Sequence, residues 1–148
     1  MEKEKVILKA EKEFYVRFSE VDSMGIVWHG SYSLYFEDAR EAFGKKYSLE
    51  YLYMFDMGFY APLVELHFEY KRPLKYKDKG RVEITFRDTD AAKIIFDYKI
   101  FSVDTNELIA TGYSVQVFLD TDYNLVWSIP VFFLQWKQMN GLIEKNNF

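Results

Sequence analysis

The sequence contains no cysteine, and this absence excludes disulfide bonds, cysteine zinc sites and thiol catalysis. Only two histidines occur, His29 and His67, and neither has a second ligand at the short spacing of a zinc site. No apolar run approaches the roughly 20 residues that span a bilayer. Residues 1–14 alternate in charge and lack the apolar core of a signal peptide. We therefore expect a cytoplasmic protein without a membrane partner.

Positive charge is also scarce. The 19 Lys and Arg residues are outnumbered by 23 Asp and Glu residues, which leaves a net charge of −4. General nucleic-acid binding needs a basic surface, so nucleic acid is excluded as a partner.

Aromatic residues, in contrast, are abundant. The 148 residues suit one domain, 1–148, and 20% of them are aromatic, with 14 Phe and 12 Tyr. A chain of this size that carries so much apolar surface is expected to bury part of it between subunits, which favours a homodimer.

The periodicity of the apolar residues predicts a strand, a long helix and then four strands at hairpin spacing. The first strand is predicted over 13–21 and the helix from Ser31 to Lys46 or Tyr47. Segment 52–62 has no regular period. Later strands are predicted over 63–71, 80–90, 93–103 and 108–120, and a short helix over 128–139. This order indicates an α+β fold whose mostly antiparallel sheet wraps around one long helix.

Asp22 stands in a glycine-containing turn just before the predicted long helix. Such an Asp commonly accepts a hydrogen bond from a nearby backbone N–H. Three neighbouring features favour a chemical role instead. Gly25 lets the backbone approach a ligand closely. Segment 25–29, "GIVWH", is apolar enough to exclude water. No Glu or Gln follows Ser31 or Ser33 by three residues, so first-turn N–H groups are free to bind an oxyanion.

Two polar features beside Asp22 have open interpretations. His29 is a candidate general acid or base, a substrate-positioning donor or a capping residue. Glu37 and Arg40 are three residues apart on the predicted helix, a spacing typical of an ion pair. The alternative is that Glu37 faces the substrate.

Three segments together resemble a known family. "VRFSEVDSMGIVWHGSYSLYFEDAR" (16–40) is similar to the signature of the hotdog-fold acyl-CoA thioesterases of the 4-hydroxybenzoyl-CoA thioesterase-like group. "FEYKRPLKYKD" (68–78) resembles the Tyr-x-x-Pro-x-x-x-x-Asp element of that family, and "SIPVFFLQ" (128–135) its Ile-Pro helix start. The resemblance implies an antiparallel sheet wrapped around one central helix. It also implies a homodimer or a dimer of dimers, with active sites between subunits.

The resemblance also assigns roles to residues. Asp22 becomes the catalytic carboxylate, as general base or nucleophile, and a backbone N–H near His29 polarises the thioester carbonyl. His29 stands where family members carry His or Tyr, and Ser31 where many carry Asn. The implied substrate contacts include Gly25, Ser31, Tyr32 and Glu37. The substrate is a thioester of CoA or of an acyl carrier protein, and no cofactor or metal is required.

A basic cluster interrupts the acidic chain between residues 71 and 81. Asp78 is the only acid among its six cations, Lys71, Arg72, Lys75, Lys77, Lys79 and Arg81. Lysines at a strand edge commonly act only to block edge pairing. The alternative is a site for the phosphates of CoA, in which Lys71, Arg72, Lys75 and Lys77 are the candidate contacts.

Two other functions remain open. A hydroxyacyl-thioester dehydratase of the same fold would use His29 with Glu37 and leave Asp22 without a role. A non-catalytic subunit that binds acyl thioesters or acyl carrier protein would need no base. A group of aromatic and apolar residues fits either an acyl pocket or the core: Trp28, Phe55, Met57, Phe59 and Tyr60.

Overall fold

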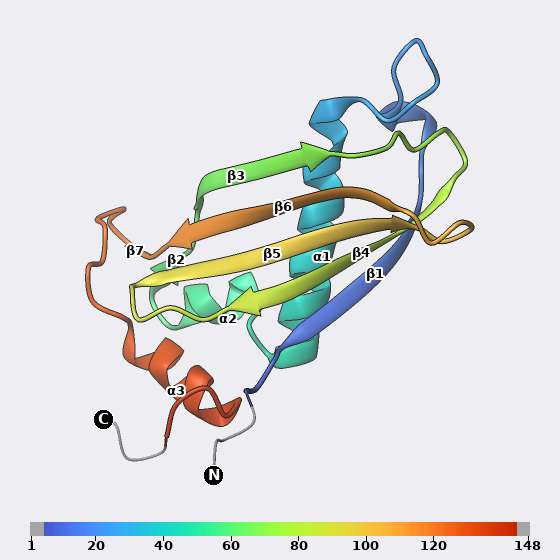
Figure 1. The fold of residues 1–148 in the computed structure, drawn as a ribbon. Helices are drawn as coiled ribbons and strands as arrows, with labels where there is room; N and C mark the ends of the chain where they lie inside the picture. The colour runs from blue at the N-terminus through green and yellow to red at the C-terminus, as the bar shows by residue number, and fades with distance from the viewer. Residues whose placement is uncertain (1–4, 145–148) are drawn as a thin grey trace.

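The structure is a computed structural model that describes residues 5–144. Its strands are β1 (Lys9–Tyr15), β2 (Phe59–Tyr60), β3 (Leu63–Tyr70), β4 (Lys79–Arg87), β5 (Lys93–Ser102), β6 (Leu108–Val117) and β7 (Leu119–Asp120). Its α-helices are α1 (Tyr32–Tyr47), α2 (Tyr51–Asp56) and α3 (Val131–Met139), and short 3₁₀ helices are η1 (Phe18–Glu20) and η2 (His29–Ser31) (Figure 1).

Five strands form one antiparallel sheet in the order β1-β4-β5-β6-β3 (Figure 1). The hairpins β4–β5 and β5–β6 make the centre of this sheet, and β1 and β3 form its two edges. A separate pair, β2 and β7, lies beside α2. The α+β class predicted from the sequence is confirmed.

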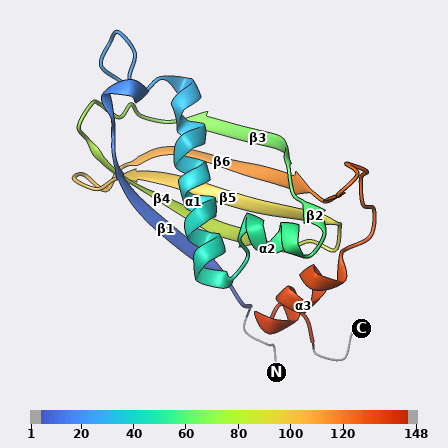
Figure 2. The ribbon, with the colours of Figure 1, turned by 180° about the vertical axis from the view of Figure 1, so that it is seen from behind.

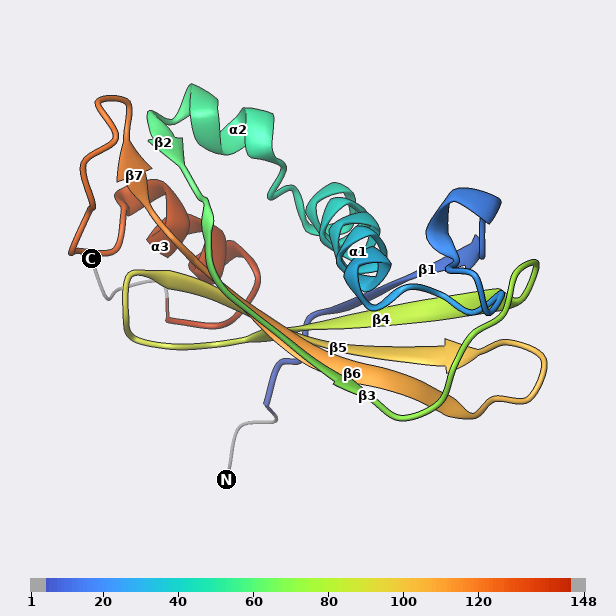
Figure 3. The same ribbon diagram turned by 90° about the horizontal axis from the view of Figure 1, so that it is seen from above.

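Helix α1 lies across one face of the sheet (Figures 2 and 3). Buried and half-exposed residues alternate along β4, as a strand with one covered face requires. The ring of Phe36 on α1 stacks on Tyr98 of β5 with their centroids 3.9 Å apart. Phe43, two turns later, meets Phe96 at 4.8 Å. These contacts fix α1 over the middle strands.

Gly112 on β6 allows this close packing. A Cβ there would lie 2.1 Å from the carbonyl oxygen of His67 and 2.8 Å from the ring of Phe36. A side chain at position 112 would therefore force the helix and the edge strand away from β6.

The prediction of a strand over 13–21 is wrong. The strand is β1, Lys9–Tyr15, and η1 follows it. The charged residues of β1 are exposed while Leu8 and Ala10 are buried, so the strand begins earlier than the aromatic residues suggested. The chain turns at η1 because the Glu20 carboxylate accepts the backbone N–H of Arg17.

Further boundaries differ from the prediction, and one of them is the end of β4, at Arg87 rather than at residue 90. The segment 52–62, which showed no period, contains most of α2 and all of β2. The strand predicted over 108–120 is divided into β6 and β7 at Phe118, which is fully buried. The terminal helix begins at Val131 rather than at residue 128, because Pro130 is its extended N-cap residue. The long helix ends at Tyr47, as predicted.

Among residues 5–144, no helix combines the length and the apolar character that crossing a membrane requires.

Candidate active site

The loop that carries Asp22 is a small closed hairpin. Val21 bridges Val27, and the backbone N–H of Asp22 donates to the carbonyl of Ile26 across 2.9 Å. Gly25 turns the chain with φ of +77° and donates its N–H to the Asp22 carbonyl at 3.0 Å. Gly25 is therefore needed for the turn itself, because residues with a Cβ rarely adopt this conformation.

The outer side of this hairpin is paired with the loop that follows β3. The backbone N–H of Val27 donates to the carbonyl of Leu74 at 2.9 Å, and that of Tyr76 donates to the carbonyl of Gly25 at 3.1 Å. Ile26 also bridges Lys75. These backbone bonds hold the Asp22 loop beside the basic cluster.

The Asp22 side chain is half-buried, and one of its carboxylate oxygens has a local role. Oδ1 accepts the backbone N–H of Met24 at 2.8 Å, which is the turn role expected of such an Asp. Oδ2 has no hydrogen-bond partner among residues 5–144. The carboxylate is thus oriented by one oxygen while the other is available for chemistry.

Asp22 lines a cleft of about 360 Å³ between its own loop, the start of α1 and the end of β3. The cleft brings together five of the residues singled out in the sequence: Asp22, His29, Tyr32, Lys71 and Arg72. The other five do not line it: Gly25, Ser31, Glu37, Lys75 and Lys77. Its walls otherwise include apolar side chains such as Met24 and Ile26.

His29 stands at the mouth of this cleft, where the chain enters η2 and continues directly into α1. Its exposed ring lies 4.7 Å from the ring of Trp28. Ser31, the N-cap residue, is buried and makes no side-chain capping bond, and the first turn of α1 carries no acidic residue. The partial positive charge of the helix start, beside the cleft, is therefore not neutralised by a carboxylate in the first turn.

Sequence reasoning missed Tyr70. Its hydroxyl donates to the carbonyl of His29 at 2.9 Å, so it ties the end of β3 to the start of the helix. The signal was present, because Tyr70 is the first residue of the Tyr-x-x-Pro segment. Burial raises the pKa of Tyr70, and burial likewise raises that of Tyr32 although a hydrogen bond from the Leu74 backbone opposes it. Both phenols remain hydrogen-bond donors at neutral pH.

Glu37 pairs with Arg40, as its spacing predicts. The Glu37 carboxylate lies 3.6 Å from Nη2 of Arg40 and its side chain is 65% exposed. A second helix pair, Glu41 with Lys45, is 3.2 Å apart on the outside of α1. A substrate contact for Glu37 stays a prediction.

The basic cluster divides into paired and unpaired cations. Lys71 lies 3.7 Å from Glu69 and Arg72 lies 2.9 Å from Glu107. Lys79 meets Glu13 at 2.7 Å.

The Lys79 contact lowers the pKa of Glu13 and raises that of the lysine. Arg81 is paired with Glu83 at 3.2 Å. Lys75 and Lys77 are exposed and have no ion pair among residues 5–144. Lys77 only lies over the ring of Tyr76, 5.5 Å from its centroid.

The five aromatic and apolar residues considered for an acyl pocket line none of this cleft. Trp28, Phe55 and Met57 are exposed, while Phe59 and Tyr60 are half-buried in and around the β2–β7 pair. Among residues 5–144, no three His, Asp or Glu side chains are grouped closely enough to hold a metal ion.

Comparisons with known proteins identify the family of this chain. Residues 16–137 match the model of the thioesterase-like superfamily, so the chain belongs to that superfamily. It is a thioester hydrolase with the hotdog fold, as the resemblance implied.

The similar proteins come from bacteria and a plant. Over 93 residues, 63% of this chain, it is 33% identical to a Bacillus subtilis protein described as a candidate acyl-CoA thioesterase, YneP, 67% of which is covered. It is 30% identical over 116 residues to the chloroplastic acyl-acyl carrier protein thioesterase ATL3 of Arabidopsis thaliana, covering 78% of this chain and 61% of that protein.

The DHNA-CoA thioesterase of Staphylococcus aureus superposes with a TM-score of 0.79 and 24% identity, over 95% of this chain and 96% of the other. At that identity the likeness shows the fold alone.

Proposed function

We propose that this protein hydrolyses an acyl-CoA thioester to a carboxylic acid and free CoA, with Asp22 as the catalytic carboxylate. The observation that carries the proposal is the cleft that an oriented, half-buried Asp22 lines together with His29 and Tyr32, at the uncapped start of α1. Thioester hydrolysis needs these two parts, a base or nucleophile and a positive site for one oxygen. The similarity to the Bacillus subtilis protein supports CoA as the thiol.

In the general-base route, Asp22 Oδ2 accepts a proton from a water molecule as that water attacks the thioester carbonyl carbon. The carbonyl oxygen becomes an oxyanion beside the backbone N–H groups at the start of the helix, near His29. The intermediate then expels the CoA thiolate, which takes up a proton. In the nucleophilic route, Asp22 attacks the carbonyl carbon itself and expels the CoA thiolate, and water then hydrolyses the resulting mixed anhydride.

The two routes differ in where an oxygen from water first appears. A single turnover in water labelled with oxygen-18 leaves the protein unlabelled if Asp22 is a base. In the nucleophilic route, the label enters the Asp22 carboxylate when water attacks the Asp22 carbon of the anhydride. A labelled peptide containing Asp22, detected by mass spectrometry, would therefore identify the nucleophilic route.

The unpaired lysines support CoA recognition. The four other cations of the basic cluster already face carboxylates, whereas Lys75 and Lys77 are free to bind phosphate oxygens. Backbone hydrogen bonds join Leu74 and Tyr76 to the Asp22 loop, and this supports a role for the two neighbouring lysines beside the cleft. Lys71 and Arg72, although each lies beside a carboxylate, line the cleft directly and are the other two proposed phosphate contacts.

The proposed functional unit is a homodimer. Within residues 5–144, strand β3 is paired only with β6 and is exposed along almost its whole length. Its exposed side chains include Leu63, Val64 and Leu66. An exposed apolar edge strand is a template for a second strand, and pairing with a second copy would cover it. Because Tyr70 at the end of β3 contacts His29, such a dimer places the cleft at the interface.

Release of free thiol from a panel of acyl-CoA substrates tests this function. Thiol release with saturation kinetics is the expected result. Consumption of a 3-hydroxyacyl-CoA without thiol release would indicate a dehydratase. Binding of the acyl-CoA without turnover would indicate a non-catalytic subunit. Acyl carrier protein thioesters belong in the same panel, because ATL3 acts on that class. If thiol is released from the acyl carrier protein thioesters but from none of the acyl-CoA esters, CoA is not the thiol of the substrate.

A further inference from the structure

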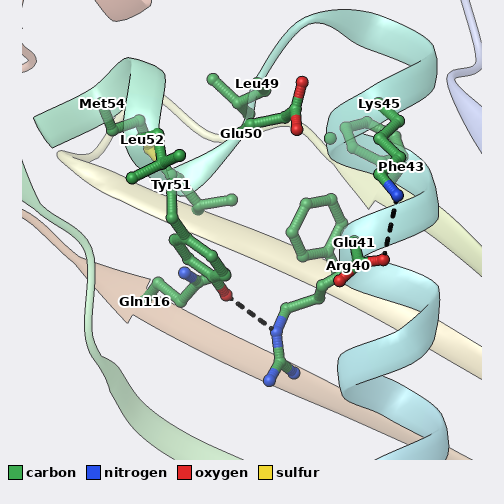
Figure 4. A pocket seen from close by; sticks show the side chains of 13 residues that line it. Arg40, Glu41, Phe43, Lys45, Leu49, Glu50, Tyr51, Leu52, Met54 and Gln116 are labelled. Atoms are coloured by element: carbon green, nitrogen blue, oxygen red, sulfur yellow. Dashed lines mark hydrogen bonds and ion pairs between the residues drawn. The ribbon is translucent and has the colours of Figure 1, made fainter. Parts of the chain in front are cut away.

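A second cavity of about 210 Å³ lies between the C-terminal half of α1, α2 and the sheet (Figure 4). It shares no lining residue with the Asp22 cleft. Most of its wall is apolar and includes Leu49, Met54, Ile94 and Phe96. Gly44 permits this arrangement, since a Cβ there would lie 2.9 Å from the carbonyl oxygen of Leu49.

Arg40 also lines this cavity, and its side chain is only 4% exposed. Its Nε donates to the hydroxyl of Tyr51 at 3.2 Å, as Figure 4 shows, and its Nη1 donates to Tyr98 at 3.1 Å. Glu37, at 3.6 Å, is its third contact. A guanidinium has five N–H donors, so these three contacts leave it capacity for a further acceptor.

The charges around the cavity define which acceptor fits. Glu41 and Glu50 line it, and Glu37 adds a third carboxylate next to the guanidinium. Lys45 also lines it but is paired with Glu41 at 3.2 Å. A carboxylate ligand would be repelled by three carboxylates. A neutral hydroxyl or carbonyl oxygen accepts a hydrogen bond from Arg40 without that repulsion.

The cavity and the Asp22 cleft lie along the same helix. Tyr32 lines the cleft and Arg40 lines the cavity, and both residues belong to α1. Eight residues separate Tyr32, in the cleft, from Arg40, and at 1.5 Å per residue this is about 12 Å. An extended peptide backbone spans about 3.3–3.6 Å for every three bonds. At the same span per bond, an extended acyl chain of about ten bonds covers that distance.

Resting on the proposed thioesterase function, we infer that the cavity between α1 and α2 binds the far end of the acyl group. Arg40 and Tyr51 select acyl groups that carry a neutral oxygen at this end. The apolar wall receives the carbon chain, and Arg40 and the Tyr51 hydroxyl bind the oxygen. This assigns a specificity role to two residues that are distant from the reacting carbonyl.

Three ten-carbon CoA thioesters test this inference: one ends in a hydroxyl, one in a methyl group and one in a carboxylate. We expect the hydroxyl-ended ester to be hydrolysed with a kcat/KM at least ~10-fold above the other two, because a site built for a hydrogen bond rejects analogues that lack it. Tyr51→Phe should reduce this preference several-fold. Tyr53→Phe is the matched control on the same helix, since its hydroxyl has no hydrogen-bond partner within residues 5–144.

Equal kcat/KM for the three esters in the wild-type protein, or equal effects of the two Tyr→Phe changes, would overturn the inference. Calorimetric titration with 10-hydroxydecanoic and decanoic acids provides a readout that needs no turnover. Tighter binding of the hydroxy acid that depends on Tyr51, without hydrolysis of any ester, would refute the proposed function and retain the binding site. Hydrolysis of the three esters with equal kcat/KM, together with equal binding of the two acids, would support the proposed function and refute the binding site.

Discussion

Tyr35 donates its phenolic hydrogen to Oε1 of Glu20 across 3.0 Å, and both side chains are buried. The same oxygen accepts the backbone N–H of Arg17 at 2.8 Å, and the Glu20 carbonyl accepts that of Trp28 at 2.9 Å. Glu20 thereby joins both ends of the Asp22 loop to α1. The position of the Asp22 carboxylate relative to the helix start depends on this junction.

The first prediction concerns alkaline stability. Burial, and then the Glu20 carboxylate, raise the pKa of the Tyr35 phenol well above its ordinary value of 10. Above about pH 10 the unfolded chain therefore loses a proton that the folded protein keeps, and the free energy of unfolding falls as pH rises. Tyr35→Phe should flatten this decline, as measured by urea unfolding from about pH 8 upward. The decline should persist in Tyr53→Phe, and an unchanged slope in Tyr35→Phe would refute the prediction.

The second prediction concerns Asp22. The amide oxygen of Asp22→Asn still accepts the Met24 N–H, so the loop is expected to keep its fold. The variant lacks a base and a nucleophile, and we expect kcat to fall by at least ~10²-fold, the scale of a positioned acid–base group. Asp56→Asn, at an exposed position on α2, is the matched control. A folded Asp22→Asn protein with nearly wild-type kcat would refute the assignment.

The third prediction concerns assembly. Val64 on the edge strand β3 is 55% exposed, and a lysine there would place a charge in the proposed dimer interface. We expect Val64→Lys to shift the protein towards a monomer in light scattering and to lose activity in parallel. Val131→Lys, at a 63% exposed position on α3, controls for the charge itself. A wild-type protein that is monomeric and active at assay concentration contradicts the proposed dimer.

Sequence patterns identified the long helix and the strands corresponding to β3, β4, β5 and β6. For β4 and β5, the alternation directly reflects one buried face. Periodicity failed for α2, whose six residues are too few to show a helical period. It also misplaced the first strand, because alternating charges in β1 resemble a solvated N-terminal segment.

Burial of Arg40 was not predictable from local spacing. The i,i+3 relationship with Glu37 is typical of a surface pair, yet Arg40 is buried. Its burial depends on Tyr51 and Tyr98, which lie 11 and 58 residues away in the sequence. The grouping of Asp22, His29 and Tyr32 followed from a short segment, whereas the contribution of Tyr70 required knowledge of how β3 meets the helix.

The last prediction concerns Lys75 and Lys77. If they bind CoA phosphates, replacing both with alanine should raise the apparent KM for acyl-CoA, and the increase should shrink at high salt because the lost contacts are charge-assisted. A truncated thioester without phosphates should barely respond, since the reacting centre is untouched. Lys5→Ala combined with Lys99→Ala removes the same charge away from the cleft and should leave both KM values unchanged. Equal increases for the two substrates would indicate an effect on folding or assembly, and no increase for either would place the phosphates elsewhere on the surface.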